Sequence, residues 1–168
     1  MPRRLLRDGR IVDDDWSYLA ESADGAAALI LTVAEWQTER AAWMARGARL
    51  GVVLQPADKV ELLAPEISRL DLIAAQFSGP SEGRGYSQAR VLREQWQFGG
   101  ELRATGFVRR DQLFFMARCG FNSFELADTD LEAAAAALST FSQAYQPSND
   151  GGLPFKLQHG GPNIPANA

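Results

Sequence analysis

Apolar runs of strand length alternate with helix-like runs from residue 26 onward, and this alternation restricts the fold more than any other feature. The strand-like runs are residues 27–33, 50–55, 70–77, 101–106 and 122–127. The helix-like runs are residues 34–46, 58–69, 86–97, 111–119 and 130–145. Because each strand is followed by a helical crossover, the pattern predicts an α/β fold with parallel strands.

The fourth strand, residues 101–106, bears on which parallel fold forms. Its apolar Leu102 and Ala104 alternate with the polar Glu101, Arg103 and Thr105. A central strand of a doubly wound sheet is apolar on both faces, whereas a barrel strand can place polar side chains inside. We therefore expect parallel βα units in an incomplete TIM-barrel-like fold, because five units are too few to close a barrel. A homodimer could cover the open edge, and a flavodoxin-like doubly wound sheet is the alternative.

The two ends of the chain differ from this central domain. Two short apolar runs flank Asp8-Gly9 within residues 4–12, which predicts a β-hairpin with a type I′ turn. The acidic run at residues 13–15 is expected to be a solvated loop. We divide the chain into a hairpin and acidic loop at 1–25, one βα domain at 26–145, and an irregular or disordered tail at 146–168.

Cysteine and histidine are too scarce for several kinds of site. Cys119 is the only cysteine and His159 the only histidine. An internal disulfide, a CxxC redox pair, a four-cysteine iron–sulfur cluster and a structural zinc site are therefore excluded. Cys119 ends the helix-like run 111–119 and has phenylalanines nearby in the sequence, so we expect a packed and inert thiol. No cofactor or metal is expected.

Charge and hydropathy limit the partners and the compartment. The formal net charge is −4 and the pI is about 5.0, which argues against general nucleic-acid binding. No apolar stretch is long enough to cross a membrane. The N-terminal MPRRLLRDGR does not resemble a secretory signal, so the cytoplasm is the expected compartment.

Arginines gather in residues 84–118. This segment holds seven arginines and three acids, a local charge of +4, so the rest of the chain carries −8. Arg103 lies in the middle of a strand and needs a partner if it is buried, and Glu101, Asp111 or an anionic ligand could supply it. Arg93 is expected to point outward.

A second signal in this segment is the glycine pair around Arg84, which opens a helix-like run. Such a loop is either an anion seat or only a tight turn with a helix cap, and it lacks the dinucleotide-binding fingerprint. The candidate anion-binding residues are Arg84, Gly85, Ser87, Arg103, Arg109 and Gln112. The candidate catalytic acid/base residues are Asp111 and Tyr86.

Several motifs in this order resemble a known bacterial family. They are GRGYSQARVLRE, GELRATG, RRDQL and RCGF, and DGRIVDDDW also resembles the opening of that family. Over roughly residues 5–148 the chain is similar to bacterial domain-of-unknown-function family 934.

The resemblance implies a role in assimilatory sulfite reduction, with sulfite reductase as the expected partner. This chain lacks the cysteines for the reductase's own cluster, so it cannot be the reductase by itself. The expected function is an accessory protein that binds sulfite, sulfate or an acidic face of the reductase. The alternatives are a small enzyme on an anionic sulfur or phosphate metabolite, or a non-catalytic interaction module whose arginines are ion-paired.

Overall fold

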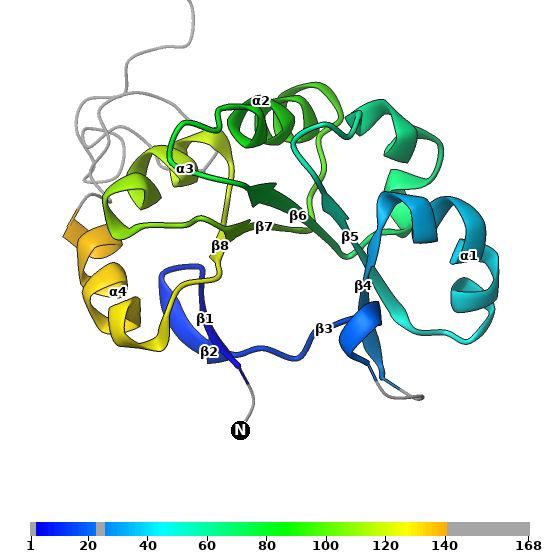
Figure 1. The fold of residues 1–168 in the computed structure, drawn as a ribbon, viewed down its shortest axis with the longest axis horizontal. Helices are drawn as coiled ribbons and strands as arrows, with labels where there is room; N and C mark the ends of the chain where they lie inside the picture. Colours follow the sequence, from blue (N-terminus) through cyan, green and yellow to red (C-terminus); the bar gives the residue numbers. More distant parts are fainter. Residues whose placement is uncertain (1–2, 23–25, 141–168) are drawn as a thin grey trace, which may run out of the picture.

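The chain forms one curved β-sheet that has helices on its outer side (Figure 1). The computed structural model describes residues 3–22 and 26–140. The sheet has eight strands in the order β2-β1-β8-β7-β6-β5-β4-β3 and curls into a half-barrel. The incomplete barrel predicted from the sequence is confirmed.

The strands are short and the helices are mostly one to three turns long. The strands are β1 (Arg4–Arg7), β2 (Arg10–Asp13), β3 (Ser17–Tyr18), β4 (Ala28–Thr32), β5 (Arg49–Leu54), β6 (Leu72–Phe77), β7 (Glu101–Gly106) and β8 (Ser123–Phe124). The α-helices are α1 (Val33–Ala45), α2 (Arg84–Arg90), α3 (Leu113–Cys119) and α4 (Leu131–Thr140). The other helical segments are η1 (Leu19–Glu21), η2 (Val60–Arg69), η3 (Val91–Gln95), η4 (Arg110–Gln112) and η5 (Asp128–Asp130).

Strands β3 to β8 pair in parallel and follow one another in sequence order. A flavodoxin-like sheet reverses its strand order at a switch point, and no such reversal occurs among these strands. The doubly wound alternative is therefore not the observed arrangement. Because every crossover runs the same way, the helices of the βα units lie on the convex face (Figure 1).

The predicted hairpin is confirmed and extends the sheet. Asp8 and Gly9 both have positive φ, at 51° and 75°, as a type I′ turn requires. Strand β1 pairs antiparallel with β2 on one side and with β8 on the other, where Leu6 lies opposite Phe124. The N-terminal segment thus adds two strands to the sheet beyond β8.

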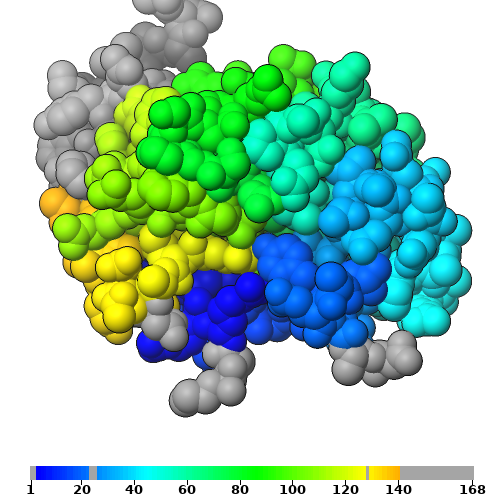
Figure 2. All heavy atoms as spheres, in the orientation of Figure 1, coloured from blue at the N-terminus to red at the C-terminus, as the bar shows by residue number. Residues whose placement is uncertain are grey.

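The main core lies between the convex face and the helices. Alternate residues of the parallel strands, such as Leu29, Val52 and Leu102, pack there. Trp36 of α1 and Met116 of α3 belong to the same cluster. A second, smaller cluster lies on the concave face and contains Trp16, Ala28, Ile30, Val53, Leu72 and Ala74. Figure 2 shows that atoms fill the space that looks open between the ribbons of Figure 1.

Two helices depart from regular α geometry. Pro65 lies inside η2, a 3₁₀ segment that kinks at Glu66. A proline in the interior of a helix breaks or kinks it, because it lacks an N–H donor and its ring clashes with the preceding turn. The expected helix 86–97 is α2 followed by the π-helical turn η3. The last helix is expected to reach residue 145, but its end and the tail at 146–168 lie outside the described residues.

The acidic run is only partly the solvated loop that its composition predicts, because Asp13 and Asp15 are exposed whereas the side chain of Asp14 is buried. The Asp14 side chain has no exposed area, and its carboxylate is bonded by arginines. The residues that follow it form β3, a strand that the sequence pattern did not reveal. The correction has a physical cause, because the buried arginine of β7 needs an anion at this position.

The fit of α2 against the sheet depends on a missing side chain at Gly85. A Cβ there would lie 2.6 Å from the Phe77 ring, which contacts the rings of Tyr86 and Phe121. We expect Gly85→Ala to lower the free energy of unfolding by about 1–3 kcal/mol in urea denaturation. The control is Gly79→Ala, because a Cβ at Gly79 meets nothing within 4 Å. Equal stability of the two variants would contradict this packing.

Candidate functional site

Arg103 lies at the centre of a polar network on the concave face. Arg103 lies in β7, where it is paired with Ala74 of β6 on one side and with Ser123 of β8 on the other. Ala74 belongs to the inner cluster, so the alternation along β7 points Arg103 to the same side. The Arg103 side chain has no exposed area.

Three carboxylates surround the Arg103 guanidinium. Asp14 accepts from both terminal nitrogens, each at 3.0 Å. Glu101 accepts from Nε at 3.1 Å and from Nη2 at 2.9 Å, and Glu125 accepts from Nη1 at 3.1 Å. These bonds match the five N–H donors that a guanidinium carries. Although burial alone would lower the pKa of Arg103, its acidic neighbours raise it above the ordinary value.

Further arginines pair with two of these acids and with the neighbouring Asp15. Arg3 lies 2.9 Å from Asp14, Arg7 lies 3.3 Å from Glu101, and Arg49 lies 2.6 Å from Asp15. Arg7 also lies 3.6 Å from Asp15 and so links the two acids. The resulting network balances Arg3, Arg7, Arg49 and Arg103 against Asp14, Asp15, Glu101 and Glu125. Four positive and four negative charges give a formal sum of zero.

Two hydroxyl groups complete the environment of Glu125. Tyr18 donates to Oε1 at 3.0 Å, and Thr105 donates to Oε2 at 2.8 Å. Burial and the negative charge of Glu125 raise the pKa of Tyr18 to about 12. Tyr18 ends β3 and Thr105 lies near the end of β7, the edge where ligands bind in βα folds. Here their hydroxyls bond the protein's own carboxylate.

The network leaves Arg103 without a free donor for an added anion. Glu101 is one of the partners of Arg103 that were expected from the sequence. Asp14 and Glu125 bond Arg103 as well. These contacts favour the interpretation that Arg103 is an internal ion pair. The same contacts tie the chain before β3 to β7 and β8, so the network closes the concave side of the half-barrel.

The other candidate residues fall into two separate places. Arg84 and Ser87 line a shallow pocket beside α2, while Gly85 packs against Phe77. Arg109 lies 3.5 Å from Asp111 at η4, and both side chains are mostly exposed. The backbone N–H of Arg109 donates to Gln112 Oε1 at 3.2 Å. The structure therefore does not gather the predicted anion-binding residues around one point.

The acid/base candidate Tyr86 lies among aromatic side chains. The Tyr86 ring contacts the Phe115 ring at a centroid distance of 4.9 Å. Burial, with smaller effects from Cys119 and Asp111, raises the pKa of Tyr86. A phenol with a raised pKa stays protonated at neutral pH and can donate a hydrogen bond. Cys119 is a buried free thiol, as expected.

Arg93 does not point outward, contrary to the expectation from the sequence. Its guanidinium donates to the backbone carbonyls of Phe98, Gly100 and Gly120 and to the side chain of Asn122. Gly120 caps α3, so Arg93 joins the turn after η3 to the end of that helix. Burial lowers the pKa of Arg93, because carbonyl oxygens carry no full negative charge. Arg93 thus acts as a structural bridge.

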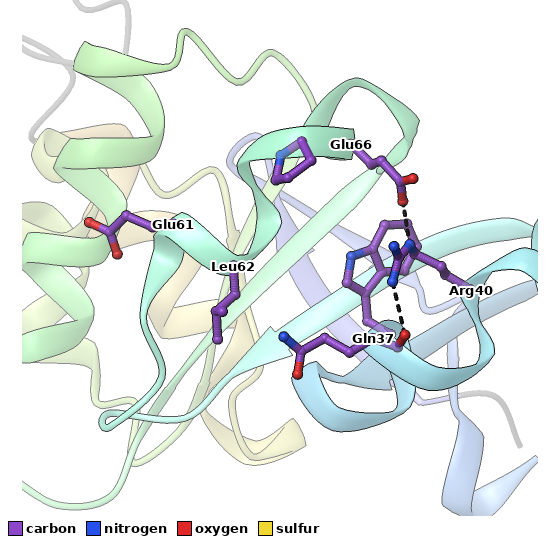
Figure 3. Close-up of a pocket in the computed structure, with 7 residues that line it drawn as sticks. Gln37, Arg40, Glu61, Leu62 and Glu66 are labelled. Atoms are coloured by element: carbon purple, nitrogen blue, oxygen red, sulfur yellow. Dashed lines mark hydrogen bonds and ion pairs between the residues drawn. The ribbon is translucent and has the colours of Figure 1, made fainter.

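A groove lies between α1 and η2 (Figure 3). Its volume is about 310 Å³, and Trp36, Leu62 and Pro65 supply its apolar walls. Figure 3 shows Arg40 bonded to Glu66 and to the Gln37 carbonyl, at 2.7 and 2.9 Å. Its central guanidinium is therefore paired within the protein.

Residues 3–22 and 26–140 contain no group of three or more His, Cys, Asp or Glu side chains that could hold a metal ion. Among the described helices, none has the length and apolar character needed to cross a bilayer.

Comparison with protein families identifies the chain's relatives. The family described as "Bacterial protein of unknown function (DUF934)" matches residues 51–155, well over half of the chain. The chain belongs to this family. The DUF934 match begins in β5, later than the residue 5 at which the resemblance was expected to start. No curated protein matches the sequence.

The DUF934 region contains only part of the network. Arg103, Glu101, Thr105 and Glu125 lie within it, whereas Asp14 and Tyr18 precede it. Sequence reasoning missed Asp14, Tyr18 and Glu125. A buried arginine signals that acids are needed, but nothing in the local pattern says which ones.

Removing the central cation tests the structural role of Arg103. We expect Arg103→Met to lower the free energy of unfolding by about 3–5 kcal/mol, because three carboxylates lose their cation. The control is Arg90→Met, whose exposed partner Glu94 lies 3.8 Å away and which should change stability by less than about 1 kcal/mol. Urea denaturation measures both, and a loss no larger than the control's would contradict the role.

The raised pKa of Tyr18 predicts that the protein loses stability in alkaline solution. The pKa of this phenol is about 12 when folded, against about 10 in an unfolded chain. Between these values the unfolded phenol loses its proton first, so stability falls as pH rises from about 10 to about 12. Tyr18→Phe should lack this component when urea midpoints are followed against pH. Equal slopes for the variant and the unmodified protein would contradict it.

Proposed function

We propose that this chain is a cytoplasmic accessory protein of assimilatory sulfite reduction that acts by binding the sulfite reductase. The link to sulfite reduction comes from the family resemblance. The single cysteine and single histidine support a role beside the reductase, because they leave no redox-active thiol pair and no cluster ligands.

The observation that supports a binding role is that every N–H donor of the Arg103 guanidinium is already bonded within the protein. The most buried arginine of the basic segment has its donors on Asp14, Glu101 and Glu125. Anion recognition then falls to exposed arginines. Exposed arginines in water hold a small oxyanion weakly, but several of them can engage an acidic protein surface together.

The surface that suits a protein partner lies around α3, and its residues come from α2, from the start of η4 and from α3. We call it the α3 patch and define it as Tyr86, Arg109, Arg110 and Phe115. Phe115 is 51% exposed although it is a large apolar side chain. Arg110 is exposed and forms no ion pair with any described residue. Aromatic residues and arginine are the types that contribute most to protein interfaces.

A binding measurement with the reductase tests the proposal. We expect the purified chain to bind assimilatory sulfite reductase in calorimetry, and more weakly as salt is raised. Phe115→Ser and Arg110→Ala should each weaken binding about tenfold or more, because interface aromatics and arginines contribute over 1 kcal/mol. Arg69→Ala, an exposed arginine at the end of η2, should leave binding unchanged.

Two outcomes would contradict the proposal. One is the absence of a complex between the folded chain and the reductase. The other is reduction of sulfite by the chain alone with an added electron donor. If the complex forms but Phe115→Ser and Arg110→Ala bind normally, the α3 patch is not the docking surface.

A further inference from the structure

The groove between α1 and η2 has apolar walls and opens to the surface of the molecule. Leu62 forms part of the wall and is 42% exposed, although it is a large apolar side chain. Figure 3 shows Leu62 across the groove from Gln37. The volume of the groove is about 310 Å³. An apolar cavity of about 150 Å³ is enough for a benzene molecule, so one aromatic side chain fits this groove.

The surroundings of this groove are negatively charged. The two helical segments that form it, α1 and η2, together contain four glutamates and two arginines, which sum to −2. Glu66 is paired with Arg40, whereas Glu61 is exposed and pairs with no cation of the described residues. A partner that fits the groove should therefore present an apolar side chain with positive charge beside it.

The α3 patch of the same chain has this composition. Phe115 is 51% exposed, and Arg109 and Arg110 lie just before α3 in the sequence. Residues 109–119 contain three arginines and one aspartate, which sum to +2. The charge of this stretch is thus equal and opposite to that of α1 and η2. Complementary charges of this kind bring two surfaces together and set their relative orientation.

The α3 patch and the groove of one molecule cannot meet. Helix α1 packs against β4 and β5, whereas α3 packs against α2 and α4. Figure 1 shows α1 and α3 on opposite sides of the molecule, both on the outside of the curved sheet. Because this face is convex, two molecules cannot make both contacts with each other at once. The groove of one molecule is therefore open to the α3 patch of another.

We propose that this chain associates with itself head to tail, with Phe115 of one molecule inserted into the groove between α1 and η2 of the next. The positive charge of Arg110 then lies beside the acidic residues of α1 and η2. The contact joins two different surfaces, so every added molecule offers a new groove or a new patch, and association continues beyond a dimer. Each contact is small, so we expect the association to be weak.

This inference goes beyond the proposed binding of sulfite reductase, but it uses the same α3 patch. If the reductase binds that patch as proposed, the reductase and a second copy of the chain compete for it. Self-association would then withhold the α3 patch until the reductase is present.

Sedimentation velocity over a wide range of concentrations tests the self-association. We expect the weight-average mass to rise past that of a dimer, and to fall when salt is added. Phe115→Ser and Leu62→Ser should each remain monomeric, and Arg110→Ala should weaken association about tenfold. The control is Arg10→Ala on β2, an exposed arginine outside both surfaces, which should associate like the unmodified chain. All four changes are at exposed side chains, and circular dichroism checks that each variant is folded.

A mixture of the two monomeric variants gives a sharper test. Phe115→Ser keeps an intact groove, and Leu62→Ser keeps an intact α3 patch. An equimolar mixture should form a 1:1 complex that grows no further, because the remaining groove and the remaining patch are both altered. Neither variant should show heat of self-association in calorimetry, whereas titration of one into the other should.

Several outcomes would overturn the head-to-tail contact. They are a chain that stays monomeric at every concentration, a mass that stops at a dimer, association that survives Leu62→Ser, and two variants that do not combine when mixed. Leu62→Ser should still bind sulfite reductase, because its α3 patch is intact. A chain that associates with itself but does not bind the reductase would contradict only the accessory role, so the two failures are distinct.

Discussion

The arrangement of several distant segments depends on one guanidinium that is buried on the concave face of the sheet. Arg103 has no exposed area, and an isolated charge in that position would be very unfavourable. The chain supplies carboxylates from three different places, at the start of β7, before β3 and after β8. The need to neutralise one side chain therefore draws distant segments together.

This requirement explains how an incomplete barrel is closed on its inner side. Apolar side chains around Trp16 cover β4, β5 and β6, and the ion network covers β7 and β8. The hairpin extends the sheet beyond β8, so the short strand β8 lies between two neighbours instead of at an edge. Because the concave face is occupied by structural contacts, we look for function on the outer surface, at the α3 patch and the groove between α1 and η2.

Local patterns predicted much of the fold, whereas the network could not be predicted from them. The turn at Asp8-Gly9, the kink after Pro65 and the parallel strands all depend on residues close in sequence. The bond from Arg103 to Asp14 spans 89 positions, and the acidic run looks the same whether it is solvated or buried. Arg93 was misplaced for a similar reason, because backbone carbonyls are acceptors that no residue type reveals. The pattern grouped Arg84 with Arg103, but α2 lies outside the sheet and Arg103 lies inside.

The side-chain Nε–H resonance of Arg103 offers the most direct test of its structural role. Its exchange with solvent, and its chemical shift during titration with sulfite and sulfate, can be followed by NMR alongside Arg110. We expect slow exchange and an unchanged shift for Arg103, because its Nε donates to Glu101 inside the protein. Exchange as fast as that of Arg110, or a saturable shift on adding either anion, would contradict the structural role and restore Arg103 as an anion-binding residue.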